Sequence, residues 1–463
     1  MDLVIKNCKI ASSRGLWECG LGIDDGKIVS ISKDHLLPAA DRVINCNGRI
    51  ILPGGIDFHV HFQDPGYTYR EDWKTGTGSA AAGGTTLVVD HGNTNPPSTT
   101  PKNLMRIIKT AERKAIVDFG INGAVTSKNL NHLPKLAAKG VMAFGEIYMA
   151  ESVPELERVE DGILLEAFKI IGKMGCIAGV HAENWEIVSH FTQKLKQAKR
   201  KDPLAHCESR PDIAEAEAIS RALLFGRETG VRLHIFHLST GLGTNILRQA
   251  RSLGQDVSAE VLPQHLLFRQ ADMKKLGPYL KCNPPIRSEA NRVALWEGLK
   301  TGVIEMVSSD HWPMPLSEVE AGWEDIWKAG SGIAGVETRL PLLLTYGVKK
   351  NLISMEKFVR ITSENPARKL GLYPRKGSIS IGADADLTIV DMKKKVKIKI
   401  DNLRTKAGYT PFENWTVVGI PWLTLVRGEI VFEEGEIVAK PGHGRYIQRD
   451  YGKKEEHGAS KKI

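Results

Sequence analysis

The sequence predicts an α/β protein: a TIM-like (β/α)8 barrel with a small β-sandwich domain built from both termini. The middle of the chain alternates apolar strand segments with amphipathic helical segments, which is typical of a barrel of parallel strands. The two flanking regions instead hold short runs of alternating apolar and polar residues between turn signals, as antiparallel strands do. A length of 463 residues is also more than one simple core needs.

The domain boundaries follow these changes of pattern. Residues 1–52 hold several short strand patterns and the hairpin signal "DDGK" at 24–27. Residues 376–442 have the same character, so we assign both pieces to one β-sandwich. The barrel then takes residues 53–375, and a basic tail takes residues 443–463.

Eight strands are expected in the barrel, and each ends in polar or ionisable residues. They are the segments 55–62, 85–92, 118–125, 141–149, 176–183, 232–239, 256–263 and 305–312. Amphipathic runs such as 154–175 lie between several of them. Because the active site of such a barrel lies at the C-terminal ends of its strands, these ends are where functional side chains are expected.

Composition excludes several classes of function. Apolar residues make up 42% of the chain and charged residues 25%, and no stretch of 18 or more apolar residues predicts a membrane span. No secretory signal is evident at the N-terminus, and the six cysteines form no CxxC pair, so we expect a cytoplasmic protein. The net charge of +9 is dispersed over short runs such as 393–399, without interleaved aromatic residues. We therefore expect no nucleic-acid and no membrane partner.

Histidines and acids collect at the expected strand ends. His59 and His61 are two positions apart and share one face of a strand, so two imidazoles converge. A lone buried histidine is more often structural, but a pair beside further histidine-bearing strand ends favours a divalent metal. The other strand-end candidates are Asp90, His91, Glu146, His181, His237, Asp310 and His311.

Two of these candidates have competing interpretations. His234 and His237 are three positions apart, so both cannot face inward on one regular strand, and one of them should be structural. Asp310 fits a carboxylate that binds metal and takes a proton from an activated water, whereas its alternative role is a helix N-cap.

Ten stretches along the chain resemble the amidohydrolase superfamily, specifically its cyclic amidohydrolases: hydantoinase or dihydropyrimidinase, allantoinase and dihydroorotase. Among them are "PGGIDFHVHFQDPG" (53–66), "GVHAEN" (179–184), "HIFHLST" (234–240), "CNPPIR" (282–287), "SSDH" (308–311) and "KGSISIGADADLTIVD" (376–391). Their order and spacing cover nearly the whole chain. The resemblance implies a metal-bearing barrel and a composite β-sandwich, in agreement with the pattern of strands and helices.

The resemblance also implies a ligand set. His59 and His61 would hold the more buried metal together with Asp310, while His181 and His237 would hold the more exposed one. The family bridge is a carboxylated lysine, but alignment on "YMA" places Glu146 at that position. A carboxylated lysine is therefore not expected. Glutamate supplies a carboxylate on a shorter side chain, so either the backbone moves inward, the metals sit differently, or only one binds well; a surface or salt-bridged acid is the other interpretation.

The resemblance predicts hydrolytic opening of a cyclic amide, ureide or imide. One or two divalent ions would lower the pKa of a water, whose proton Asp310 would accept and pass to the leaving ring nitrogen. Zinc is the expected metal because the site is rich in imidazole, with iron, nickel, cobalt and manganese as alternatives. We expect a homo-oligomer, a dimer or a tetramer, as the state of assembly.

The substrate signals conflict. Dihydroorotases resemble "HxRdPG", whereas this chain has Gln63, which removes a bidentate partner for a carboxylate, and Met314 replaces a family histidine. Asn93 in "GNTNPP" and Asn283 still match dihydroorotases, and His311 is a further substrate-binding candidate. The lead prediction is a hydantoinase- or allantoinase-like enzyme for a neutral ureide ring, with dihydroorotase second. A non-catalytic scaffold is the alternative of another class.

Overall fold

Eight parallel strands close into a barrel, as the sequence predicts. The computed structural model describes residues 1–153 and 156–451. The first three barrel strands form one hydrogen-bonded sheet and the next five form another, and bridges Gly123–Phe144 and Val60–His311 join the two. The strands are β8 (Gly55–Val60), β9 (Thr85–Asp90), β10 (Asp118–Ile121), β11 (Phe144–Tyr148), β12 (Ile177–His181), β13 (Arg232–Ile235), β14 (Val257–Val261) and β15 (Met306–Val307). Their alternating inward and outward residues make the two faces of the barrel wall.

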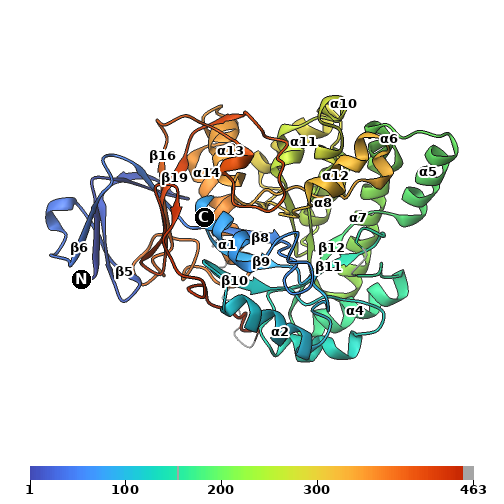
Figure 1. Ribbon diagram of the computed structural model, residues 1–463. Coiled ribbons are helices and arrows are strands. Elements are labelled where there is room, and N and C mark those ends of the chain that lie inside the picture. Colours follow the sequence, from blue (N-terminus) through green and yellow to red (C-terminus); the bar gives the residue numbers. More distant parts are fainter. Residues whose placement is uncertain (154–155, 452–463) are drawn as a thin grey trace.

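Helices surround the barrel (Figure 1). In the helix Pro101–Glu112 (α2), Thr100 is the N-cap and Pro101 occupies the first turn, while Leu104, Ile107 and Ile108 are buried against the strands. The helices that follow strands β8 to β14 are α1 (Trp73–Ala82), α2 (Pro101–Glu112), α3 (Leu133–Ala137), α4 (Asp161–Lys173), α5 (Trp185–Gln197), α6 (Pro203–Ser209), α7 (Asp212–Thr229), α8 (Gly241–Ser252), α9 (Pro263–Leu267), α10 (Met273–Leu276) and α11 (Glu289–Thr301). Those that follow β15 are α12 (Leu316–Glu320), α13 (Arg339–Leu342), α14 (Met355–Val359) and α15 (Asn365–Lys369). One apolar face per helix thus completes the core around the sheet.

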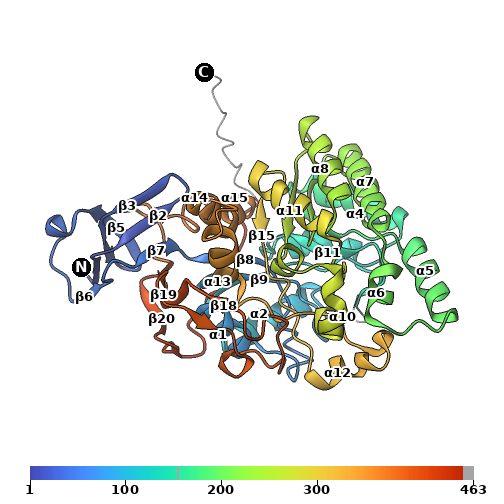
Figure 2. The same cartoon turned by 90° about the horizontal axis from the view of Figure 1, so that it is seen from above.

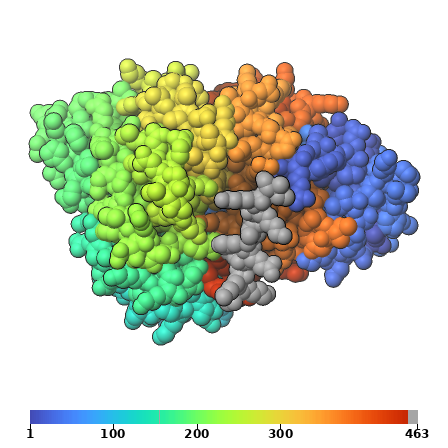
Figure 3. Space-filling view, turned by 180° about the vertical axis from the view of Figure 1, so that it is seen from behind, coloured from blue at the N-terminus to red at the C-terminus, as the bar shows by residue number. Residues whose placement is uncertain are grey.

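Both ends of the chain build a β-sandwich beside the barrel. One sheet has the order β5-β4-β1-β6 and the other the order β21-β20-β19-β16-β7-β2-β3. Its strands are β1 (Leu3–Lys6), β2 (Lys9–Ser12), β3 (Gly15–Glu18), β4 (Gly20–Asp24), β5 (Lys27–Ser32), β6 (Arg42–Asn45), β7 (Ile50–Pro53), β16 (Leu387–Asp391), β19 (Ile420–Val426), β20 (Glu429–Glu433) and β21 (Glu436–Ile437). Strand β7 pairs with β16, so residues more than 330 positions apart become neighbours. Figure 2 shows the blue N-terminal strands at one end of the molecule, against the orange-to-red C-terminal part, and Figure 3 shows the blue N-terminal residues at that end from behind.

A buried network of ion pairs connects the barrel to the β-sandwich. Lys376 is almost completely buried and its Nζ lies 2.8 Å from Asp118 of β10 and 2.6 Å from Asp386 beside the sandwich. Arg427 also contacts Asp118. Such a network is costly to break because removing the cation leaves uncompensated buried carboxylates.

The first residues of the expected basic tail pack on the barrel. The Ile447 N–H donates to the Phe119 carbonyl at 2.8 Å, and the Tyr451 hydroxyl donates to the Val141 carbonyl at 2.9 Å. Residues 452–463 lie outside the described part of the chain. Among the described helices, none is long and apolar enough to cross a membrane.

Candidate active site

The predicted metal-binding side chains meet at the C-terminal ends of the barrel strands. His59 lies in β8 and Glu146 in β11, and His181 ends β12. His237 and Asp310 follow the ends of β13 and β15. Parallel strands in a closed barrel bring these ends together, although the residues span most of the sequence.

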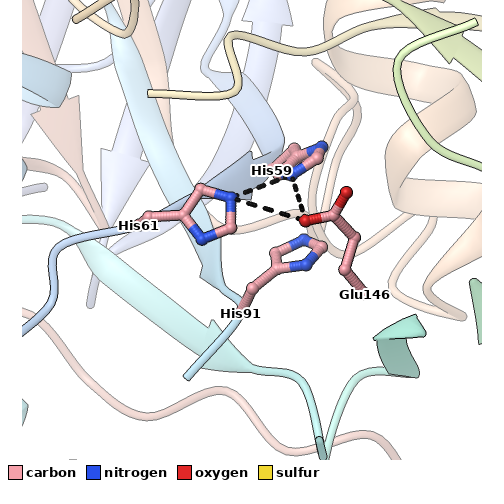
Figure 4. Close-up of side chains that lie close together, drawn as sticks. All are labelled: His59, His61, His91 and Glu146. Carbon is pink, nitrogen blue, oxygen red and sulfur yellow. Dashed lines mark hydrogen bonds and ion pairs between the residues drawn. The ribbon is translucent and has the colours of Figure 1, made fainter. Parts of the chain in front are cut away.

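One half of the cluster is formed by the two histidines of β8 and its end. His59 Nε2 lies 3.0 Å from His61 Nε2 (Figure 4). Asp310 Oδ1 is 3.3 Å from the first nitrogen and 3.2 Å from the second, and Glu146 Oε2 is 3.6 and 3.9 Å away. Two ring nitrogens that face each other at this distance need a proton or a cation between them.

The other half of the cluster uses the second oxygen of the same glutamate. Glu146 Oε1 lies 3.2 Å from His181 Nδ1 and 2.5 Å from His237 Nε2, and these two nitrogens are 3.0 Å apart. The Glu146 carboxylate therefore lies between the two histidine pairs, with one oxygen toward each. The shorter side chain still reaches both pairs.

Three further side chains orient the imidazoles. Glu260 of β14 accepts the His59 Nδ1–H at 2.6 Å, Asn93 Oδ1 lies 3.1 Å from His61 Nδ1, and Glu183 accepts the His181 Nε2–H at 2.9 Å. In each case the partner contacts the ring nitrogen that faces away from the cluster. The lone pair of the second ring nitrogen is thereby directed at the cluster. Metal-ligating histidines in proteins are normally held in this way. The sequence analysis missed Glu183 and Glu260, although an acid in an apolar strand was a signal for the second.

The charges of the cluster favour a cation. Burial raises the pKa of the Glu146 carboxyl, but the electrostatic effect of His237 and the contacts with His181 and His237 outweigh it and hold that pKa well below its usual range. Burial likewise opposes ionisation of Asp310, yet His59 and His61 keep its pKa lowered. The carboxylates are thus ionised and need positive charge beside them, which protons or a metal ion supply. A set of imidazole and carboxylate donors suits a divalent ion of the zinc type.

His91 lies against the first histidine pair. Its ring stacks on His59 with centroids 4.1 Å apart and an interplanar angle of 18° (Figure 4). His91 Nε2 contacts the Phe58 carbonyl at 3.3 Å and the Asn122 amide at 3.3 Å. Burial and the neighbouring His59 hold the pKa of His91 well below its usual range, so its ring is neutral. Its ring packs against one face of the His59 ring.

The structure separates His234 and His237, the two candidate ligands on and just after β13. His237 joins the cluster, whereas His234 Nδ1 contacts Ser258 Oγ at 2.8 Å. His234 Nε2 is 3.6 Å from Glu260 Oε2, so His234 packs behind the carboxylate that orients His59.

Three residues of the site hold backbone conformations that side chains rarely adopt. Gln63, His237 and Asp310 have φ values of 57°, 35° and 48°. Non-glycine residues in this region cost on the order of 1 kcal/mol or more and concentrate at functional sites. These turns after the strands aim His237 and Asp310 back into the barrel mouth.

A cavity of about 400 Å³ opens above the cluster. Glu146, His181, His237 and Asp310 line it, together with Tyr148, Ser152, Asn283, Trp312 and Met314. Of the four side chains expected to bind substrate, Asn283 is the one that lines the cavity. Gln63, Asn93 and His311 lie behind its wall, where His311 contacts Glu71 at 3.3 Å. The sequence analysis missed Arg70, which does line it.

Comparison with known proteins agrees with this geometry. The model of the amidohydrolase family matches residues 50–431. The chain belongs to the amidohydrolase family. Within this family it lies in the group of cyclic amidohydrolases, enzymes that act on C–N bonds, and the predicted fold and class of enzyme are confirmed.

Relatives of three kinds cover almost the whole amidohydrolase chain. An L-hydantoinase of Paenarthrobacter aurescens is 39% identical over 97% of this chain and 98% of its own. A dihydroorotase of Methanosarcina mazei is 41% identical over 96% and 98%, and an allantoinase of Solibacter usitatus is 35% identical over 95% and 96%. The solved structure of L-hydantoinase (dihydropyrimidinase) from Arthrobacter aurescens matches with a TM-score of 0.95 over 97% of this chain and 100% of that one, at 39% identity.

Proposed function

We propose that this amidohydrolase hydrolyses a ring C–N bond of a cyclic amide and requires a divalent metal. The observation that carries the proposal is the placement of Glu146 between two histidine pairs at the floor of a cavity. Asp310 also lines this cavity, and its Oδ1 lies 3.3 Å from His59 Nε2 and 3.2 Å from His61 Nε2.

The chain offers two adjoining sets of metal ligands. His59, His61 and Asp310 would hold one ion, His181 and His237 would hold the second, and Glu146 would serve both. A divalent ion bound here would supply Lewis acidity and lower the pKa of a water molecule. Zinc is the metal we propose. Because Glu146 is itself a carboxylate, the site would assemble without carbon dioxide.

Asp310 is the residue we propose as the general base. Its carboxylate is 13% exposed and lines the cavity, so it can reach both the cluster and a bound ring. It would accept a proton from the attacking water and return it to the ring nitrogen that leaves. Residues positioned in this way contribute roughly 10²–10⁴-fold to rates.

A hydantoin- or allantoin-like ureide is the proposed ring, and dihydroorotate is the second candidate. The L-hydantoinase and allantoinase relatives support the first, and the dihydroorotases of Methanosarcina support the second. The scaffold alternative is disfavoured because a scaffold needs neither the strained backbone nor the three orienting side chains around the histidines. We also propose a homo-oligomer, which sedimentation measurements would test.

Metal analysis and a panel of rings test the proposal together. The chain would be purified after growth with zinc, manganese or cobalt and assayed on hydantoin, dihydrouracil, allantoin and dihydroorotate. We expect stoichiometric metal and turnover of at least one ring. His59→Ala should lose both, while His190→Ala, which alters an exposed histidine on α5, should keep both. A chain that holds no metal and opens no ring would refute the proposal.

A further inference from the structure

Arg70 brings a guanidinium group to the mouth of the substrate cavity. It lies in the connection between β8 and α1, its side chain is 14% exposed, and it lines the same cavity as Asp310 and His181. Its Nη1 donates to Gln63 Oε1 at 3.3 Å, and its Nη2 lies 2.9 Å from Glu318 Oε2. Arg70 thus connects the loop after β8 to helix α12 across the cavity mouth.

The contact with Gln63 changes what that glutamine implies about the substrate. A glutamine at position 63 cannot bind a carboxylate through a charged, two-pronged contact. The Arg70 guanidinium, however, touches the end of the Gln63 side chain and faces the cavity. The cavity therefore has a guanidinium although position 63 carries no arginine.

One polar atom of the cavity lacks a partner in the described part of the chain. Asn283 Oδ1 is buried and makes no hydrogen bond to other described residues. Asn283 lines the cavity, and its amide nitrogen is held by Ser152 at 3.2 Å, which leaves its oxygen to accept a ring N–H. Buried polar atoms without partners are costly, and a ligand that satisfies them gains binding energy.

The charge at the mouth favours an anionic ligand. Arg70 and the exposed Lys328 both line the cavity, and among the described residues Glu318 is the acid that lines it beside them. The Glu318 side chain is 34% exposed, so its pair with Arg70 is partly solvated and weak. A carboxylate of the substrate can take the place of Glu318 on the guanidinium.

We propose that Arg70 is a specificity-determining residue that binds a carboxylate carried by a substituent of the substrate ring. The preferred substrates would then be acidic cyclic ureides, either a six-membered ring with a carboxylate or a hydantoin with a carboxymethyl group. This inference rests on the proposed ring-opening function and narrows it. It also reverses the expectation of a neutral ring that Gln63 alone suggests.

Matched pairs of rings test this role of Arg70. Dihydroorotate and dihydrouracil differ by one carboxylate, as do 5-carboxymethylhydantoin and 5-methylhydantoin. In the metal-loaded wild type we expect higher kcat/KM for the acidic member of at least one pair. Arg70→Met should lower the acid-to-neutral ratio of kcat/KM at least tenfold, mainly through KM, and Arg70→Lys should restore part of it. Glu318→Gln should raise the ratio.

Arg106→Met is the matched control, because it removes an equal charge from an exposed site on α2. It should leave the ratio unchanged. The inference is overturned if Arg70→Met changes both members of each pair by the same factor, if Arg106→Met has the same effect, or if the wild type prefers the neutral rings.

Binding separates failure of this inference from failure of the proposed function. If the wild type opens no ring of either pair and neither hydantoin nor allantoin, ring opening is refuted, and calorimetric titration of the metal-loaded protein with dihydroorotate then tests Arg70 alone. Binding that weakens at least tenfold in Arg70→Met supports the inference, and equal binding by both proteins refutes it.

Discussion

Replacing Glu260 by glutamine tests whether the carboxylates around the histidines tune metal binding. Glu260 is completely buried and accepts the His59 Nδ1–H at 2.6 Å. Burial raises the pKa of Glu260, but His59 and His234 reverse that effect and hold it well below its usual range, so the contact is charge-assisted. Glutamine keeps the shape and removes the charge, and its amide can also present a donor to the ring.

The expected loss follows from this single contact. Hydrogen bonds to charged groups contribute about 1.5–3 kcal/mol. Changes to residues that orient metal ligands weaken metal affinity by roughly 10–100-fold, which corresponds to about 1.4–2.7 kcal/mol. The two ranges agree, so Glu260→Gln should bind zinc roughly 10–100-fold more weakly. Activity at saturating metal should fall less than the affinity.

Competition with a chelator of known zinc affinity would measure this change. Glu305→Gln is the matched control, since Glu305 pairs with Arg251 at 2.8 Å and contacts none of the histidines of the cluster. Zinc affinity within twofold of the wild type in Glu260→Gln would refute the claim that this carboxylate orients His59 for metal binding. An equal loss in Glu305→Gln would assign the effect to general destabilisation.

Three other predictions concern the general base Asp310, the loss of stability at low pH, and the ion pairs between the barrel and the β-sandwich. Asp310→Asn should lower kcat by about 10²–10⁴-fold while metal analysis still finds bound metal, and retained activity would exclude Asp310 as the base. Burial opposes ionisation of Glu183, but Arg210 and His181 lower the pKa of its carboxyl in the folded protein. The ionised Glu183 therefore stabilises the fold above the unfolded pKa of about 4.5, and this stabilisation is lost as the pH falls toward the lower pKa of the folded state. In urea titrations of the metal-free protein, Glu183→Gln should therefore show a shallower loss of stability below about pH 4.5 than the wild type, and identical slopes would contradict this. Lys376→Met should cost about 3–5 kcal/mol of unfolding free energy because it removes the buried cation that Asp118 and Asp386 share. Lys27→Met, in which the lysine is 43% exposed, should cost less than about 1 kcal/mol, and equal losses would show that burial of the pair is immaterial.

The sequence by itself determined the fold and the location of the metal-binding candidates. His59 and His61 share a strand face because side chains alternate along a strand, and parallel barrel strands end at one rim. The first rule depends only on neighbouring residues and the second only on the fold class. The residue pattern was therefore sufficient to place His181, His237 and Asp310 near the same rim as well. The strand pattern left the choice between His234 and His237 open and the family resemblance favoured His237, which the turn after β13, with a φ of 35° at His237, directs into the cluster.

Only the tertiary structure decided which side chains orient the histidines and which face the substrate. Glu260 contacts His59 across 201 positions of sequence, so no local pattern could pair them. Gln63 was expected at the substrate, but its side chain lies behind the cavity wall, and Arg70 from the same loop lines the cavity instead. Loop conformation depends on packing against distant elements such as α12, and here it decides that a guanidinium group lines the cavity.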